Sequence, residues 1–552
     1  MPRTSLRVHG CLFVWFWREG NSHVPVGVRG VSRAALWKTT DPSLWKVHAY
    51  HPQSWGNWGF QVSSHTDDGA IMFARGGNQE ARGGGSSIGA QYYSGMLEEL
   101  DDDNEFHYDR KNNALYWSPS PSPAATTPSG RSATAGVAAP PTAATELVVP
   151  QLARLIELVG SSNAGTKTAS NIKISGLTLK HTAPTFCCDH PYESVSGGDW
   201  SIHRGGMIYV ENATDSEVSG CILDSPGGNG IFLSGHSKGM LITRNEVKNS
   251  GDSSIAAVGY TALMDGREAT YPYNNTISYN HLHSWGVWGK QTSAVFFGMT
   301  REQTFDHNIV HTGPRAGMNQ NDGFAGGNTF SYNLVFNTVM DTGDHGNFNS
   351  WDRKPWVWLE DPADPASQVR MTPQRHRITH NFIIRTSFLG PSNNLYAIDH
   401  DDGSSMYNDT SNYLVYGGIK FRDGLSKHAS GNFMAFPNGP DKRETPFAAQ
   451  CQGNNNSYVA NTVVSGTGQF YGACAKYNDD AASDHVTIDY NSFYSPGANF
   501  SDGGCAAGGS SGLGWKEWQS HGLGQDQHST LADASTITYE EMLNAGRMRL
   551  FP

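Results

Sequence analysis

The sequence predicts an all-β protein built around a right-handed parallel β-helix, preceded by an N-terminal β-rich lobe. Two observations favour this fold class: a repeat of two short strands around one Asn, and a content of 63 glycines. Glycine adopts the backbone conformations that tight turns require, so many turns and many short strands are expected. A chain of 552 residues is also too long for one spherical core.

The repeat begins near residue 170 and continues to about residue 500. Each unit has a short β-branched stretch, an Asn or Gly, a second short apolar stretch and a Gly or Ser turn, as in MLITRNEVKNSG from residue 240 and NTFSYNLVFNT from residue 328. The repeated Asn positions are Asn245, Asn280, Asn308, Asn333, Asn381, Asn412, Asn432, Asn461 and Asn491. They lie 35, 28, 25, 48, 31, 20, 29 and 30 residues apart.

A period of this length with short strands is typical of a solenoid whose coils bury their apolar faces against one another. Leucine-rich and helical repeats would need helical segments, and propeller blades would need about 40 residues with four strands each. A parallel β-helix fits best. In it the repeated Asn side chains can stack as a ladder, because an amide both donates and accepts hydrogen bonds and Asn tolerates a left-handed bend.

Composition divides the chain into five segments. Residues 1–33 are unassigned, and residues 34–118 form a partial N-terminal β-rich lobe with an expected hairpin, FHYD–RKNN–ALYW. Residues 119–147 are a low-complexity insertion rich in Pro, Ala, Thr and Ser. Residues 148–510 form the β-helix. Residues 511–552 form a C-terminal cap, with a short Thr-capped helix expected in STITYEEMLNAGR at the end of the solenoid.

The charge and the cysteines restrict the partners. A formal charge of −12 without a basic stripe argues against a nucleic-acid partner, and no segment reaches the roughly 20 apolar residues that cross a bilayer. The seven cysteines lack zinc-type spacing, so no structural metal is expected. An extracellular or secretory location is favoured, although the short apolar run at 11–17 lacks a clear cleavage signal.

The largest spacing, between Asn333 and Asn381, locates an insertion, and insertions in repeats map to loops that often form the binding face. Three segments here and beside it concentrate polar residues, and each is expected to follow a repeat strand directly. They are NQNDGFAGGN with Asp322; DTGDHGNFNSWDRKPW with Asp341, Asp344, His345, Trp351, Asp352, Arg353 and Lys354; and IDHDDGSSMYND with Asp399, His400, Asp401 and Asp402.

These segments suit glycosidic bond cleavage, which needs two carboxyl groups about 5–5.5 Å or 6.5–9.5 Å apart. Coils stack about 4.8 Å apart, so carboxylates one or two coils apart meet either distance. Neighbouring carboxylates also raise one another's pKa, which keeps one of them protonated as the acid. Turn formation is an equal alternative for Asp322 and Asp341, and a salt bridge beneath Trp351 is one for Asp352 and Arg353. No cofactor is expected, with Ca²⁺ as the exception that the aspartates leave open.

The segments LEELDDDNEFHYDRKNNALYW, ISYNHLHSWGVWGKQTSAVFF, TGDHGNFNSWDRKPW and IDHDDGSSMYND resemble right-handed parallel β-helix glycosidase-like proteins of the pectin lyase-like fold. The most similar family is glycoside hydrolase family 141 with its relatives, which is known for α-L-fucosidase and xylanase activity on plant polysaccharides. The resemblance covers roughly residues 34–500, apart from the insertion.

The resemblance implies a hydrolase that acts on a complex polysaccharide or oligosaccharide. It implies catalysis by Asp352 together with one of Asp399, Asp401 or Asp402. The substrate-binding candidates are Asp322, Asp344, His345, Trp351, Arg353, Lys354, His400, Lys290 and Trp288, with a sugar ring expected on Trp351. Two alternatives stay open. One is a Ca²⁺-dependent polysaccharide lyase with Arg353 or Lys354 as its base, and the other is a carbohydrate-binding β-helix without activity.

Overall fold

The computed structural model describes residues 14–19, 22–28, 41–50, 54–67, 69–76, 91–100, 105–118, 148–161, 168–185, 193–195, 200–260, 271–322, 326–352, 358–359, 369–370, 374–386, 396–437, 445–449, 454–472, 486–502, 513–520 and 524–550. The chain forms two compact units. One comprises Met1–Val149 with Cys187–Pro191, and the other comprises Pro150–Phe186 with Tyr192–Pro552.

The first unit contains a six-stranded antiparallel sheet in the order β1-β2-β5-β4-β3-β6. Its strands are β1 (Val14–Glu19), β2 (Ser22–Val28), β3 (Lys46–Tyr50), β4 (Asn57–His65), β5 (Ile71–Gly76) and β6 (Gln91–Ser94), with short 3-10 helices at Pro42–Leu44 and Leu97–Glu99. The sheet therefore begins inside the segment 1–33 that the sequence left unassigned. The expected hairpin is confirmed as β7 (Glu105–Asp109) and β8 (Ala114–Ser118).

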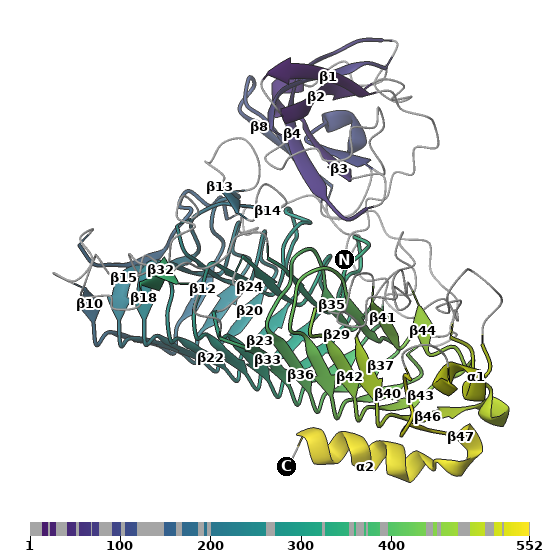
Figure 1. Ribbon diagram of the computed structural model, residues 1–552. Coiled ribbons are helices and arrows are strands. Elements are labelled where there is room, and N and C mark those ends of the chain that lie inside the picture. Colours follow the sequence, from purple (N-terminus) through teal and green to yellow (C-terminus); the bar gives the residue numbers. More distant parts are fainter. Residues whose placement is uncertain are drawn as a thin grey trace, which may run out of the picture. The chain divides into compact units, whose positions relative to one another are not determined.

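The second unit is a parallel β-helix of three long sheets, to which each coil contributes one strand in turn (Figure 1). In the first sheet β9 (Ile156–Val159) and β10 (Ala169–Ser170) both pair with β15 (Ile208–Thr214); then follow β18 (Ile231–Lys238), β21 (Ile255–Val258), β24 (Val295–Gly298), β27 (Met318–Asn321), β30 (Phe348–Trp351), β35 (Ile398–His400), β38 (Ile419–Phe421), β41 (Phe447–Ala449) and β44 (Tyr471–Gly472).

The second and third sheets run beside it through the same coils. The second contains β11 (Lys173–Ser175), β16 (Glu217–Ser219), β19 (Leu241–Thr243), β22 (Thr276–Ser278), β25 (Thr304–Asp306), β28 (Thr329–Ser331), β33 (His376–Thr379), β36 (Tyr407–Thr410), β39 (His428–Ser430), β42 (Ser457–Val459) and β45 (Thr487–Asp489). The third contains β12 (Thr178–Lys180), β17 (Ile222–Asp224), β20 (Glu246–Lys248), β23 (His281–His283), β26 (Ile309–His311), β29 (Leu334–Phe336), β34 (Phe382–Ile384), β37 (Tyr413–Val415), β40 (Phe433–Ala435), β43 (Thr462–Val464), β46 (Ser492–Ser495) and β47 (Thr530–Asp533). Two short antiparallel pairs, β13 (Glu193–Val195) with β14 (Trp200–Ile202) and β31 (Trp358–Leu359) with β32 (Val369–Arg370), lie outside these sheets.

Alternation along each strand separates the core from the outer faces. In the third sheet the middle residues Val247, Leu282 and Val310 are fully buried in the core, and their neighbours on each strand face outward. Burial of each such side chain contributes roughly 1.5–3 kcal/mol to the free energy of unfolding. The same rule decides which side chains of every coil are available for chemistry.

The expected Asn ladder is confirmed along its whole length. From Asn280 onward, the side-chain oxygen of each Asn accepts from the backbone N–H and the amide of the Asn one coil before it; between Asn308 and Asn333 these distances are 2.9 Å and 3.1 Å. Asn245, the first of the series, accepts from the backbone N–H of Cys221. The left-handed bend is not at the Asn, however. It is at the preceding residue, such as Tyr279 or Tyr332, where φ is 57° and 54°. The Asn must point inward to reach the next coil, so the outward-facing residue before it takes the bend.

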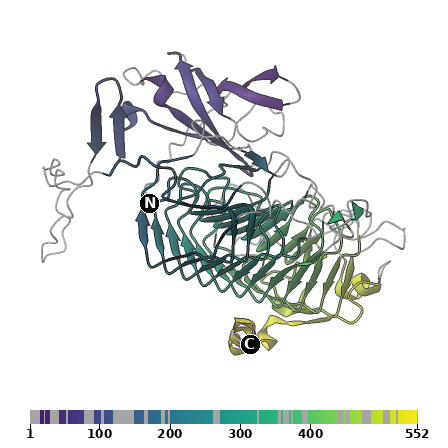
Figure 2. The same ribbon diagram turned by 90° about the vertical axis from the view of Figure 1, so that its left-hand side faces the viewer.

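Two helices lie in the C-terminal part, and only the first covers the end of the core. Trp518 of α1 (Trp515–Ser520) is buried in the core cluster, so α1 covers its end. The Thr cap of α2 (Tyr539–Leu550) is confirmed: Thr538 and Glu541 exchange hydrogen bonds of 2.7 Å and 3.1 Å between their backbone N–H groups and side chains. The helix does not close the solenoid end, because its apolar residues Met542 and Ala545 pack beside β37 and β40 instead (Figures 1 and 2).

Several expectations fall on residues outside the described ranges, namely Arg353, Lys354 and the insertion at 119–147. Among the residues that are described, no helix combines the length and apolar character needed to cross a membrane.

Candidate active site

The outer face of the first sheet changes character along its length. One outward column runs in register through Tyr209, Phe232, Ala256, Phe296, Asn319, Asn349, Asp399 and Lys420. Its first half is apolar and packs in a cluster of buried hydrophobic side chains. From β27 onward the column is polar or charged, although these side chains are equally buried. A buried polar column of this kind marks the candidate site.

The centre of the site is the Lys420 ammonium. Its Nζ lies 2.8 Å from Oδ1 of Asp399 and 3.7 Å from Oδ1 of Asp401. The Asp399 side chain has no exposed area and that of Lys420 is 4 % exposed. Asp399 lies in β35 and Asp401 lies just after it. Because both contact the same ammonium group, their Oδ1 atoms cannot be farther apart than the sum of these two distances.

Arg422 forms the more exposed rim. Its Nη1 donates to Asp401 at 2.8 Å and its Nε lies 3.0 Å from Asp402. The side chains of Arg422, Asp402 and Asp401 are 41 %, 28 % and 15 % exposed. The charged cluster thus has a buried floor, Asp399 with Lys420, and an edge that solvent or a ligand can reach.

Two carboxyl groups of this site have raised pKa values. Burial and the nearby negative charge of Asp401 raise the pKa of Asp344, partly offset by Lys420. Burial raises the pKa of Asp399 to about 7, although Lys420 opposes this. The pKa of Lys420 is itself raised, because the carboxylates around it outweigh the effect of burial. Asp344 is only partly buried, so a ligand can reach it.

Arg315 is a buried cation whose pKa is influenced by Asp401, Asp344 and Asp399. It is 1 % exposed, donates to Oδ1 of Asn319 at 3.1 Å and hydrogen-bonds Nε2 of His345. Its guanidinium lies 5.1 Å from the centre of the Trp351 ring. Burial lowers the pKa of Arg315 to about 9 and lowers that of His345 well below its usual range. Trp351 is 3 % exposed, so stacking of a sugar ring on it would require these neighbours to move.

Asn349 is an unusual member of the column. It lies between Asn319 and Asp399 in register and has no exposed area. Within the described part of the chain, neither its amide nitrogen nor its amide oxygen has a hydrogen-bond partner. An unsatisfied buried polar group costs about 1–3 kcal/mol. Its position beside Asp399 in the register places this unsatisfied amide next to the charged cluster.

The turns after three strands of the first sheet carry Asp322, Asp352 and Asp402. Backbone hydrogen bonds of 3.0 Å from Asp322 to Trp351 and of 2.9 Å from Asp352 to Asp402 join these coils. The three segments that the sequence analysis selected therefore lie on adjacent coils. The carboxylate of Asp352 accepts a hydrogen bond of 3.3 Å from the buried Tyr407 hydroxyl, which directs it toward the interior.

His400 also lies inside, where its Nδ1 and Nε2 contact Ser350 at 2.8 Å and Asp409 at 2.9 Å. His400 and Asp399 are not loop residues, as the sequence suggested, but residues of β35. Trp351 is likewise a residue of β30. Their polarity concealed these strands, because the expected pattern assumed that strand residues in each coil would be apolar.

Trp288 and Lys290 lie in the turn between β23 and β24. Nζ of Lys290 lies 3.2 Å from Oδ2 of Asp341, so this pair joins turns that are two coils apart and does not reach the aspartates of β35. Trp288 is 40 % exposed. Both remain candidates for substrate contacts beyond the charged cluster.

Arg315 and Arg422 were not among the residues selected from the sequence. Arg422 could have been predicted from its spacing to Lys420, because side chains two positions apart in an extended chain face the same side. Arg315 carried no such signal, because it reaches the site from the turn before β27.

Comparison with known proteins supports the fold. The sequence model of a family described as "Right handed beta helix region" matches residues 206–348, and the second unit is a right-handed parallel β-helix. A solved structure titled "Glycoside hydrolase" is similar to 77 % of this chain and 73 % of its own, with 15 % identity and a TM-score of 0.51. At this identity the similarity establishes the fold alone.

A second solved structure, "The complex structure of XylC with xylose", covers 59 % of this chain and 50 % of its own at 9 % identity and a TM-score of 0.34. That similarity is too low to carry an argument. No curated protein matches the sequence.

Proposed function

We propose that this protein is a glycoside hydrolase that acts on a polysaccharide or oligosaccharide at the outer face of the first sheet. The observation that carries the proposal is the group of carboxylates around Lys420, in which the pKa of Asp344 and Asp399 is raised. Glycosidic cleavage needs one protonated and one ionised carboxyl group in the same site. The similarity to a solved glycoside hydrolase agrees with this assignment.

In this proposal the partly exposed residues do the chemistry. Asp344 is the general acid that protonates the leaving oxygen, because its raised pKa keeps the proton available and because a ligand can reach it. Asp401, paired with Arg422, is the nucleophile or the base that activates water. Asp399 has no exposed area, so its proposed role is to position Lys420 between the carboxylates.

The remaining candidates have supporting roles. Asp402 and Arg422 form the accessible edge and are suited to bind sugar hydroxyls. Asp352, held by Tyr407, positions the turn that carries Asp402, to which its backbone is hydrogen-bonded. We also propose that the family assignment lies near glycoside hydrolase family 141.

The polysaccharide lyase alternative needs a neutral basic side chain. The raised pKa of Lys420 keeps it protonated, and the carboxylates raise the pKa of Arg422 in the same way. Lys420 and Arg422 are therefore poor bases, whereas the bases expected for a lyase, Arg353 and Lys354, lie outside the described residues. Lys420 and Arg422 also neutralise aspartates that a Ca²⁺ ion would otherwise bind, which supports hydrolysis at this cluster.

The test is release of reducing sugar from a panel of plant polysaccharides and oligosaccharides, with and without EDTA. We expect activity that is insensitive to EDTA, and losses of about 100-fold or more in Asp344→Asn and Asp401→Asn. Asp306→Asn, on the second sheet, is the matched control and should retain activity. Asp352→Asn should have a smaller effect than Asp401→Asn.

Three results would contradict the proposal. Unsaturated, ultraviolet-absorbing products that disappear with EDTA would indicate a lyase. Binding of the glycans without turnover would indicate a carbohydrate-binding protein. Full activity of Asp401→Asn on any substrate would show that Asp401 is not the catalytic nucleophile or base.

A further inference from the structure

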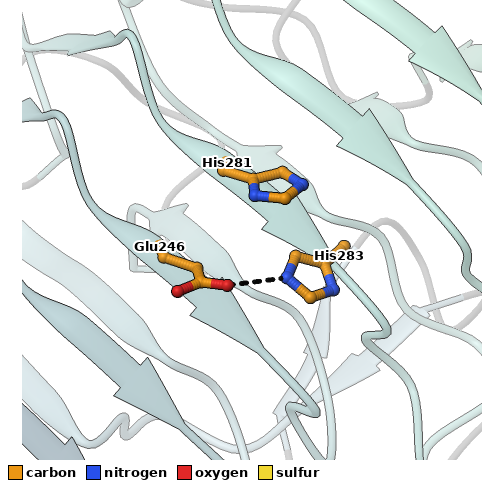
Figure 3. A group of neighbouring side chains, drawn as sticks. All are labelled: Glu246, His281 and His283. Carbon is orange, nitrogen blue, oxygen red and sulfur yellow. Dashed lines mark hydrogen bonds and ion pairs between the residues drawn. The ribbon is translucent and has the colours of Figure 1, made fainter.

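A second cluster of titratable side chains lies on the outer face of the third sheet, on a different face of the β-helix. Glu246 begins β20, and His281 and His283 are the first and third residues of β23 (Figure 3). Leu282, between the two histidines, points into the core, so both imidazoles face outward on the same side. Glu246 lies beside His281 in the strand register.

The geometry of this cluster is compact. One ligand atom from each of Glu246, His281 and His283 can be chosen so that all lie within 4.8 Å of one another. Nε2 of His283 is 3.2 Å from Oε1 of Glu246. In tetrahedral zinc sites, ligand atoms about 2.0–2.1 Å from the metal lie roughly 3.3 Å apart. Small side-chain rotations would therefore bring the three groups onto one ion.

His311, in the next coil, is a third nitrogen donor and a fourth possible ligand. Its Nε2 lies 2.8 Å from Nε2 of His281, and its ring stacks on that of His283 with centroids 5.0 Å apart.

We propose that Glu246, His281 and His283 form a binding site for a divalent transition-metal ion of the Zn²⁺ or Cu²⁺ class, with His311 as an additional ligand. Imidazole and carboxylate ligands suit these ions. The three residues are partly exposed, so the site can be reached and leaves a coordination position for water or a small ligand. The proposal is independent of the proposed hydrolase activity.

One cation lies beside this site. Nζ of Lys248 is 3.4 Å from Oε1 of Glu246 and would compete with a metal ion. Asp224, beside Lys248 in the register, offers the lysine another partner. We therefore expect Lys248 to weaken metal binding without preventing it.

The test is calorimetric titration of the chelator-treated full chain with ZnCl₂ and with CuCl₂. We expect one tight site per chain in the wild type. Affinity should fall at least about 10-fold in His281→Gln and in His283→Gln. His307→Gln is the matched control, because His307 is an exposed ring in the turn after β25, and it should bind as the wild type does.

A second readout covers the case in which a histidine variant fails to fold. Lys248→Met removes the competing cation and leaves the three ligands in place, so it should bind Zn²⁺ several-fold more tightly. Substitution with Co²⁺ should give the absorption bands of a tetrahedral or five-coordinate ion, lost in His283→Gln. The proposal is wrong if the wild type shows no stoichiometric site, or if both histidine variants bind as His307→Gln does.

Discussion

Asn333 and Asn349 are 16 residues apart and equally buried, yet their surroundings differ completely. The side chain of Asn333, inside the β-helix, accepts two hydrogen bonds from Asn308 and donates to Phe305 and Asn381. The side chain of Asn349, on the outer face of the first sheet, has no partner in the described part of the chain. The same residue type thus stabilises the fold in one column and is left unsatisfied in the other.

The difference follows from what each column must do. Amides stacked one coil apart satisfy one another, so the inner ladder removes the cost of burying polar groups. The outer column mixes Asn349, Asp399 and Lys420, whose groups cannot all be paired by their neighbours. Unsatisfied groups and raised carboxyl pKa values are tolerated in folded proteins chiefly where a ligand uses them.

The sharpest test of the outer column is removal of its central cation. Lys420→Met leaves Asp399 buried beside Asp401 without its partner, so we expect a loss of about 3–5 kcal/mol in the free energy of unfolding at pH 8. With Lys420 present the folded-state pKa of Asp399 is about 7, above its unfolded value, and it rises further in the variant because the cation that lowers it is gone. The buried carboxyl of the variant is therefore neutral at pH 5 and becomes costly only as the pH rises toward that higher pKa. The loss should therefore be smaller at pH 5, as measured by urea unfolding at both values.

The double variant Lys420→Met with Asp399→Asn supplies the control. It has no buried charge at this pair, so its stability should recover toward the wild type at pH 8. A loss in Lys420→Met that does not depend on pH would indicate a packing effect in place of an electrostatic one.

The inner ladder should show the next largest effect. Asn333→Ala leaves the backbone N–H of Asn308 and the carbonyl of Phe305 without a partner, so we expect a loss of about 3 kcal/mol in the free energy of unfolding. Chemical denaturation would measure it. A loss below about 0.5 kcal/mol, less than one typical hydrogen bond contributes, would mean that the ladder adds little to stability.

Loss of an exposed hydrogen bond at a helix end should reduce the free energy of unfolding less than the two preceding substitutions do. Thr538→Ala removes the N-terminal cap of α2, and we expect a loss of about 1 kcal/mol, confined to that helix. Hydrogen exchange of the α2 amides would detect it, with the amides of β37 as the internal reference. Equal acceleration in β37 would show that the helix supports the adjoining coils.

The smallest change in stability is expected for Asn349→Ala, the counterpart of Asn333→Ala. No hydrogen bond is lost, and the relief of an unsatisfied amide offsets the lost packing, so the free energy of unfolding should change by less than about 1 kcal/mol. Glycan turnover should nevertheless fall. Equal destabilisation by the two Asn substitutions would end the distinction between the columns.

Some features followed directly from the order of residues. The Asn ladder, the hairpin of β7 and β8 and the Thr cap of α2 depend on neighbours along the chain or on a regular period, and all three are confirmed. A local or periodic pattern is sufficient for them, because hydrogen bonding between repeats requires the same residue at the same place in every coil.

Only some residues of the candidate site could be predicted from such local or periodic patterns. The aspartates of β35 and its turn stood out, but Arg315 and the inward direction of Asp352 did not. The metal-binding cluster was hidden as well, since Glu246 and His281 are 35 positions apart and meet only because their strands are neighbours in the third sheet.

The repeat in the chain specified a β-helix because its period alone sets where each coil turns and which residues enter the core. The period does not determine which side chains meet on the outer faces. Which charges meet there, which carboxyl groups become buried and which amide lacks a partner depend on the insertions between strands and on the register of adjacent coils. Electrostatic interactions act across space between coils, so only the folded arrangement decided them.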